Sequence, residues 1–136
     1  MVKFKILEHT ADGKFRAFGK SRERQFGNAV LAMFSYMFDI KKINPKIKKQ
    51  VKVSAKDEKA LLYRWLEEFL VLLDTAQFIP CKIDKIKITK KSNKWEIIGS
   101  MLGNKVGKHK HIGSVKAVTY AEMEIKKDFV QVVVDL

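Results

Sequence analysis

The chain has 136 residues, of which 46% are hydrophobic, and its 28 Lys and Arg residues outnumber its 15 Asp and Glu residues to give a formal net charge of +13. This length suits a single domain over residues 1–136, and the hydrophobic content excludes a chain that stays disordered. The charge favours polyanionic partners, although many lysines alternate with apolar residues and would equally form the solvated face of strands.

The cysteine and hydropathy patterns indicate in which cellular compartment the protein is expected. One cysteine, Cys81, leaves no partner for an internal disulfide, which fits a reducing environment. Lys3 and Lys5 interrupt the N-terminal apolar residues, and no apolar run is long enough to span a bilayer. We therefore expect a soluble, cytoplasmic protein without a membrane partner.

The first third of the chain predicts two strands and a helix. Apolar residues alternate with lysines over residues 2–6, which predicts a half-buried strand, and residues 15–18 predict a second one after the turn at 9–14. Ser21 then suits a helix N-cap. One apolar helix face is expected from the residues at helical spacing: Phe26, Val30, Met33, Phe34 and Met37. The sequence Asn44-Pro45 ends this unit.

The middle of the chain predicts a third strand and a second helix. The strand lies around residues 51–53, and Asp57 can cap the helix that follows. The apolar stripe of this helix is expected to be core: Leu61, Leu62, Trp65, Leu66, Phe69, Leu70 and Leu73. Residues 78–80 are expected to close the helix.

After residue 82 the apolar period changes to two, which is typical of strands. Strands are predicted around residues 86–88 and over 95–102, with a turn at 92–93. Residues 103–113, with three glycines, predict a loop. The remaining predicted elements are a long strand over 115–125, a tight hairpin at 127–128 and a last strand over 129–134.

The predicted order is therefore two strands, a helix, a strand, a helix and four strands. Helices gather early and strands late, which favours an α+β domain with two helices packed on one face of a largely antiparallel β-sheet.

Enzyme motifs are missing from the sequence, which has no glycine-rich phosphate loop, CxxC pair, HExxH or GxSxG. His109 and His111 could ligate a metal, but without a third ligand nearby a solvated loop is the better interpretation. An acid–base set of Glu8, His9 and Lys116 lacks a nucleophile. We expect a protein that is not an enzyme and has no catalytic residues.

Two acids stand where strands end. Asp12 lies in the turn after the first strand, and Asp135 ends the last strand, next to Leu136. If the two strands are neighbours, both carboxylates and the Leu136 carboxylate would meet. Such hard oxygen donors suit calcium or magnesium.

Five segments of the sequence carry a family resemblance. They are "EHTAD" at 8–12, "FRAFG" at 15–19, "LLYRWLEEFLVLLDT" at 61–75, "KAVTY" at 116–120 and "VVVDL" at 132–136. Together, and in this order, they resemble the archease family over the whole chain. His109 also falls seven residues before Lys116, where that family tends to place a histidine.

The resemblance implies a function. Archease acts as a protein cofactor of the RNA ligase RtcB, which joins tRNA halves and other RNA ends. It promotes guanylylation of a histidine on the ligase, so that the ligase turns over repeatedly. The resemblance therefore implies an RtcB-type RNA ligase as partner, with RNA contacted weakly or indirectly.

The resemblance also implies site residues. Family members bind a divalent cation, usually calcium, through positions that correspond here to Asp12, Asp135 and Leu136. Glu8, His9, Lys116, Thr119 and Tyr120 are expected to dock the partner or support the cation site. This sequence departs from the family pattern at three positions: Gly13 follows Asp12 without an intervening residue, Ser114 replaces an acid, and Ala121 replaces a histidine.

The sequence leaves two other functions open. The net charge of +13 fits a basic nucleic-acid-binding module, although such modules usually expose aromatic residues beside the basic ones and the aromatics here fall on core-facing positions. A chaperone-like protein-interaction domain is the other possibility.

Overall fold

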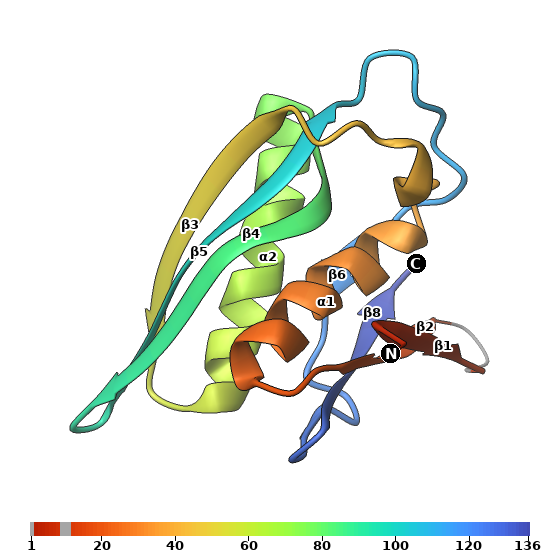
Figure 1. Ribbon diagram of the computed structural model, residues 1–136. Coiled ribbons are helices and arrows are strands. Elements are labelled where there is room, and N and C mark those ends of the chain that lie inside the picture. The colour runs from red at the N-terminus through yellow and green to blue at the C-terminus, as the bar shows by residue number, and fades with distance from the viewer. Residues whose placement is uncertain (1, 9–11) are drawn as a thin grey trace.

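Residues 2–8 and 12–136 are described by the computed structural model, in which two antiparallel sheets enclose two helices (Figure 1). The elements are β1 (Phe4–Leu7), β2 (Gly13–Phe18), α1 (Arg22–Ser35), the 3-10 helix η1 (Ile40–Lys42), β3 (Ile47–Ala55), α2 (Glu58–Ala76), β4 (Phe78–Lys91), β5 (Lys94–Lys105), β6 (Ala117–Val118), β7 (Glu124–Ile125) and β8 (Phe129–Asp135). The first sheet has the order β1-β2-β8-β6, with β7 also paired to β8, and the second has the order β3-β5-β4. The expected α+β class is confirmed, whereas the division of the strands between two sheets was not evident from the sequence.

Both helices begin at the residues that the sequence indicates. Ser21 Oγ accepts a hydrogen bond of 3.1 Å from Arg24 N, and Asp57 Oδ1 accepts one of 2.8 Å from Ala60 N. Each bond satisfies an amide group that the first helical turn leaves without a partner. α2 ends at Gln77, whose φ of 54° is left-handed and turns the chain into β4. No helix in the described residues is long and apolar enough to cross a membrane.

The core lies between the sheets, and within it Trp65 of α2 contacts both α1 and β5. Its ring is fully buried and packs edge-on against Phe69, with 4.7 Å between ring centroids. Its Nε1 donates a hydrogen bond of 3.0 Å to the carbonyl of Phe26 on α1. Gly99 of β5 leaves room for the ring, because a Cβ there would lie 2.6 Å from it. The predicted apolar stripes of both helices are buried, except for the partly buried Leu70.

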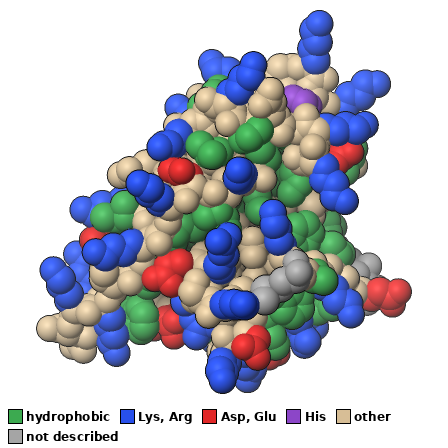
Figure 2. Space-filling model, in the orientation of Figure 1, with side chains coloured by type: hydrophobic (Ala, Val, Ile, Leu, Met, Phe, Trp, Pro, Cys, Tyr) green, Lys and Arg blue, Asp and Glu red, His purple; other side chains and the backbone are tan. Residues whose placement is uncertain are grey.

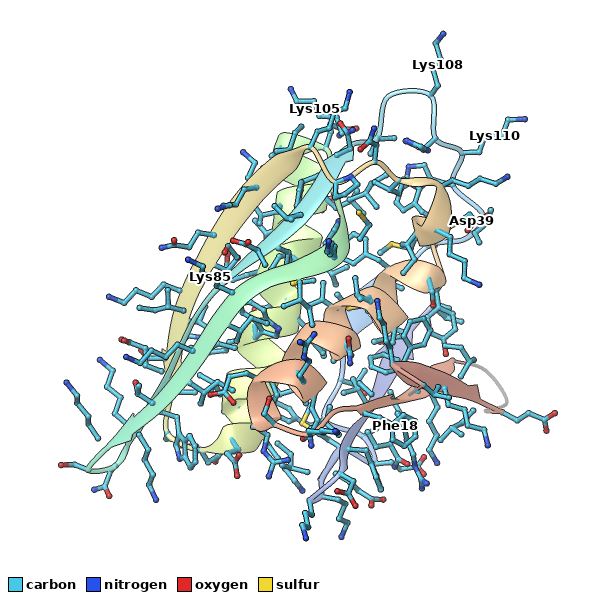
Figure 3. All side chains as sticks on the ribbon, in the orientation of Figure 1. Phe18, Asp39, Lys85, Lys105, Lys108 and Lys110 are labelled. Atoms are coloured by element: carbon cyan, nitrogen blue, oxygen red, sulfur yellow. The ribbon has the colours of Figure 1, made fainter. Side chains whose placement is uncertain are left out.

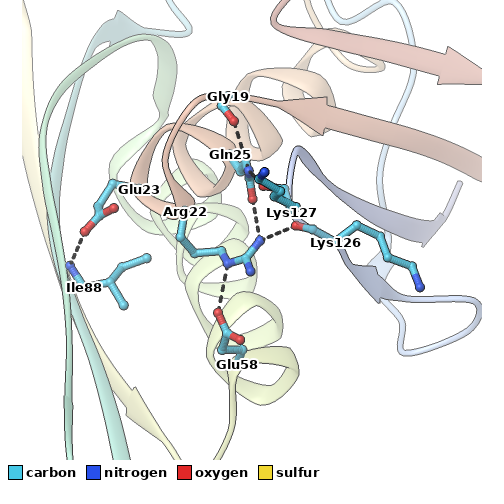
Figure 4. Close-up of polar contacts among 8 residues, drawn as sticks. All are labelled: Gly19, Arg22, Glu23, Gln25, Glu58, Ile88, Lys126 and Lys127. Carbon is cyan, nitrogen blue, oxygen red and sulfur yellow. Dashed lines mark hydrogen bonds and ion pairs between the residues drawn. The ribbon is translucent and has the colours of Figure 1, made fainter.

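A polar network fixes the starts of both helices against the β7–β8 turn (Figure 4). Arg22 Nε donates to Glu58 Oε2 at 2.9 Å, and Arg22 Nη1 donates to Gln25 Oε1 at 2.6 Å. Nη1 also donates to the Lys126 carbonyl at 2.6 Å. Gln25, which is 1% exposed, donates from Nε2 to the Lys127 carbonyl at 2.8 Å. These contacts satisfy buried polar groups that would otherwise destabilise the fold.

The prediction of a single long strand over residues 115–125 is wrong. Only the two-residue strands β6 and β7 pair with β8, and the chain turns away from the sheet between them. Thr119 Oγ1 accepts a hydrogen bond of 3.2 Å from Ala121 N, and Glu122 has a φ of 50°. A side-chain bond to a nearby amide and a left-handed residue both favour a turn over a continuous ladder.

The boundary around residues 78–80 also differs from the prediction. These residues begin β4 rather than close α2, and β5 extends to Lys105, three residues into the loop predicted over 103–113. Gly103 explains the difference, because a Cβ there would overlap the carbonyl oxygen of Ile79. The glycine thus permits two strand backbones to approach closely, and Pro80 is tolerated because β4 is an edge strand.

Candidate functional site

Backbone pairing brings residues from three of the five motif segments to one end of the first sheet. In the β2–β8 pair, Gly13 faces Val134, so the residues next to them, Asp12 and Asp135, lie at the same end of the two strands. Paired residues such as Gly13 and Val134 have Cα atoms about 4.5–5.5 Å apart. On the other side of β8, Lys116 N donates a hydrogen bond of 2.7 Å to the Asp135 carbonyl. We call Asp12, Lys116, Asp135 and Leu136 the strand-end site.

The ring of Tyr36 lies against the start of β2 and explains the glycine that follows Asp12. A Cβ on Gly13 would lie 2.7 Å from Tyr36 Cζ. The Tyr36 hydroxyl donates a hydrogen bond of 3.2 Å to the Lys14 carbonyl, which holds the ring in place. A glycine directly after Asp12 therefore has a packing reason.

Tyr36 also makes the stability of this end depend on pH. Burial raises the pKa of its hydroxyl, and the negative charge of Asp12 raises the pKa further. Above about pH 10 the unfolded chain releases this proton before the folded chain does, so the free energy of unfolding falls as pH rises. We expect the urea midpoint to drop between about pH 9 and pH 11, and Tyr36→Phe to reduce the drop. Titrations in a chelator, with Tyr63→Phe for comparison, measure it; equal slopes for wild type and Tyr36→Phe would contradict the assignment.

The strand-end site offers oxygen donors but few of them. Within residues 2–8 and 12–136, no three His, Cys, Asp or Glu side chains form a group that could hold a metal ion. Asp12 and Asp135 supply two carboxylates, and Leu136 can add only main-chain oxygens. Because calcium takes six to eight oxygen ligands, water or a partner would complete the shell. The donor chemistry fits a hard cation, and calcium binding here stays a prediction.

The two histidines of the loop after β5 do not add ligands to this site. His109 N donates to the Val106 carbonyl at 2.7 Å, within the loop itself. The His111 ring packs against Phe38, with 4.4 Å between centroids, and thus helps to hold the loop against the chain after α1. Neither histidine belongs to a metal-ligand group among the described residues.

The expected supporting residues lie at different distances from the site. Glu8 is exposed just after β1, and His9 lies outside the described residues. Thr119 Oγ1 donates a hydrogen bond of 2.8 Å to the Val133 carbonyl, so Thr119 holds the chain to β8 two residues from Asp135. Tyr120 stacks on Tyr63 of α2 at 4.4 Å between centroids and stays 52% exposed.

Sequence reasoning missed the contacts that fix the outer side of the first sheet. Lys14 forms an ion pair with Glu122 at 3.0 Å, and Arg16 Nε donates to Gln131 Oε1 at 2.9 Å. Gln131 in turn donates from Nε2 to the Glu122 carbonyl at 2.8 Å. The first two contacts join residues more than a hundred positions apart in sequence, and no local pattern signals them.

The chain matches the model of the archease protein family over residues 4–136. It is 38% identical over 132 residues to a protein named archease from Sulfurisphaera tokodaii, covering 93% of this chain and 90% of that protein. A protein of the same name from Methanosarcina barkeri is 35% identical over 139 residues, covering 98% and 95%. The solution structure of protein 1598 of Methanobacterium thermoautotrophicum superposes with a TM-score of 0.81 at 31% identity, covering 98% of this chain and 99% of that one. The chain therefore belongs to the archease family.

Proposed function

We propose that this chain is a non-enzymatic activator of an RtcB-type RNA ligase. In this role it promotes guanylylation of the ligase's histidine and lets the ligase act repeatedly on tRNA halves or other RNA ends. Membership of the archease family supports the proposal. The observation that carries it is the placement of Asp12 from "EHTAD", Lys116 from "KAVTY" and Asp135 from "VVVDL" at one end of the β2–β8 pair, although Asp12 is more than a hundred residues from the other two.

The strand-end site would hold a divalent cation, calcium in our proposal, between Asp12 and Asp135. When bound, the cation supplies concentrated positive charge to oxygen atoms of the ligase or its nucleotide. The chain's part is to fix the donors: Asp12 directly precedes the paired residue Gly13, Asp135 is itself paired with Ala117, and the Asp135 carbonyl accepts a hydrogen bond from Lys116 N. Donors in or directly next to a paired strand are positioned more firmly than donors on a free loop.

Lys116 and Tyr120 extend the proposed docking surface beyond the acids. Lys116 is exposed within the strand-end site, so its ammonium can meet a phosphate of the ligase's nucleotide. Tyr120 presents a half-exposed ring whose other face is braced by Tyr63. A rigid aromatic ring suits a protein interface because little side-chain entropy is lost on binding. Glu8 directly follows the Leu7–Lys14 pair and would flank the same end, and His9, outside the described residues, stays a predicted supporting residue.

A ligation assay with limiting ligase tests the proposal. An RtcB-type ligase, GTP, a divalent cation and a labelled RNA with ligatable ends are incubated with and without this protein. We expect product to stop near one ligation per ligase without the protein and to continue through further turnovers with it. Guanylylated ligase, measured with labelled GTP, should accumulate faster in its presence.

Two outcomes separate this proposal from its alternatives. Product formed by the protein in the absence of ligase would show that it is itself an enzyme. A protein that leaves both turnover and guanylylation of its own host's ligase unchanged would not be a ligase activator. A point variant with its charge changed away from the strand-end site, Asp74→Asn on α2, serves as the matched control because Asp74 is exposed.

A further inference from the structure

The outer face of the second sheet is not covered by either helix. α1 and α2 pack against its inner face, where Val51, Val53, Ile97 and Met101 are buried (Figure 1). The strand register places the alternate residues on the other face, in rows that run across β3, β5 and β4. Seven exposed lysines occupy this outer face, and we call them the lysine face: Lys48, Lys52, Lys82, Lys85, Lys87, Lys91 and Lys94.

The lysine face carries an excess of positive charge that is mostly unpaired. Two acids share it, Asp84 and Glu96. Asp84 lies at a register shift in β4, pairs with Lys48 at 3.2 Å and accepts a hydrogen bond of 2.7 Å from Ser100 Oγ. The Ser100 hydroxyl, and then Lys48, hold the pKa of Asp84 below its usual value. Within residues 2–8 and 12–136, Lys48 is the one lysine of this face in an ion pair.

The face is also hollowed at the end where β4 turns into β5. A cavity of about 460 Å³ is lined there by Lys87, Thr89, Lys91, Lys94, Glu96 and Ile98. Lys and Arg side chains project over the three strands in Figure 2, and Lys85 points away from both helices in Figure 3. The same figure shows Lys105, Lys108 and Lys110 projecting around the far end of β5. Positive charge thus follows the sheet from end to end.

We propose that the lysine face binds the phosphate backbone of RNA. Rows of unpaired lysines on a firm sheet match a chain of phosphates, and their counterion release would drive binding. Among the described residues no aromatic side chain lies on this face, whereas base stacking and protein interfaces both rely on aromatic anchors. Lysine is moreover depleted at protein interfaces. The expected binding is therefore independent of sequence.

The choice of RNA over DNA as the ligand rests on the proposed function. The inference that the lysine face binds a phosphate backbone does not. The lysine face and the strand-end site belong to different sheets, with the helices between them (Figure 1). RNA on the second sheet and a ligase at the end of the first sheet would therefore use separate residues. The protein could hold an RNA beside the ligase that it activates.

Direct binding without ligase tests the proposal. Fluorescence anisotropy compares wild type with Lys52→Glu/Lys85→Glu/Lys87→Glu, on a labelled RNA hairpin and on a single strand, from 50 to 200 mM salt. The matched control is Lys20→Glu/Lys59→Glu/Lys127→Glu, which makes the same charge change at exposed lysines elsewhere. We expect the lysine-face variant to lose at least about tenfold in affinity and its salt slope to fall by about two to three. The control should lose less than about threefold, since it removes only long-range attraction.

Each other result overturns the proposal. Equal losses in the two triple variants would mean that net charge, not this face, attracts RNA. If the protein does not bind RNA at 50 mM salt, the lysines serve instead to prevent the edge strands from pairing with strands of other molecules. Binding of polyglutamate as tightly as RNA would indicate an acidic protein as partner. Ligase activation is measured separately, so its failure beside intact RNA binding would reject the proposed function and not this surface.

Discussion

Replacing Asp12 or Asp135 with asparagine is expected to lower ligase stimulation at least about tenfold. Mutation of a residue that only supports a metal ligand already reduces metal affinity or activity by this factor. Asparagine keeps the size of the side chain but removes the charge that a cation needs. Calcium binding, measured by isothermal titration calorimetry, should weaken in parallel. Both acids lie at the strand ends rather than in the core, so the free energy of unfolding should change by about 1 kcal/mol or less.

The control for these variants is Asp74→Asn, which removes one negative charge from the exposed surface of α2. It should leave calcium binding and stimulation as in wild type. Lys116→Ala adds a second readout, since it should reduce stimulation while leaving calcium bound. If Asp12→Asn and Asp135→Asn both stimulate like wild type, the strand-end site does not dock on the ligase. If they lose activity only because they unfold, the two acids have a structural role.

The Trp65→Ala substitution is expected to cost about 3–5 kcal/mol of unfolding free energy, as for other large aromatic residues truncated in a core. The indole is fully buried, packs against Phe69 and fills the space that the missing side chain of Gly99 leaves. Its loss also leaves the buried carbonyl of Phe26 without the Nε1 donor. For a chain of this size the melting temperature should fall by on the order of 10 °C. Urea titration and thermal melts followed by circular dichroism measure both quantities.

Val71→Ala on the same helix is the matched control, because Val71 is 45% exposed. Its free energy of unfolding should change by no more than about 0.5 kcal/mol. Trp65→Phe should lie between the two variants, since it keeps much of the ring volume but not the hydrogen bond. A Trp65→Ala protein that loses less than about 1 kcal/mol would mean that the core between α1, α2 and β5 is packed differently from the structure described above.

The sequence by itself determined the features that depend on neighbouring residues. The N-caps at Ser21 and Asp57 could be predicted because a cap bonds an amide three residues away. The helix stripes and the β4–β5 turn at Ser92 could be predicted because helical and strand periods place apolar residues on one face. The motifs "EHTAD", "KAVTY" and "VVVDL" were also sufficient to indicate the family, which the full-length match confirms.

The tertiary structure alone decided how those local pieces combine. Local periodicity did not reveal that the strands form two sheets, because pairing of β2 with β8 joins residues more than a hundred positions apart. The same pairing brings Asp12 and Asp135 to one end of the two strands, and the close approach of the Tyr36 ring explains why position 13 is a glycine. The predicted strand over 115–125 failed because a hydrogen bond at Thr119 and a left-handed residue at Glu122 outweighed its apolar alternation. In the sequence, the lysines that alternate with apolar residues are indistinguishable from one strand to the next. Seven of them lie on one open face because both helices pack on the other side of β3, β5 and β4.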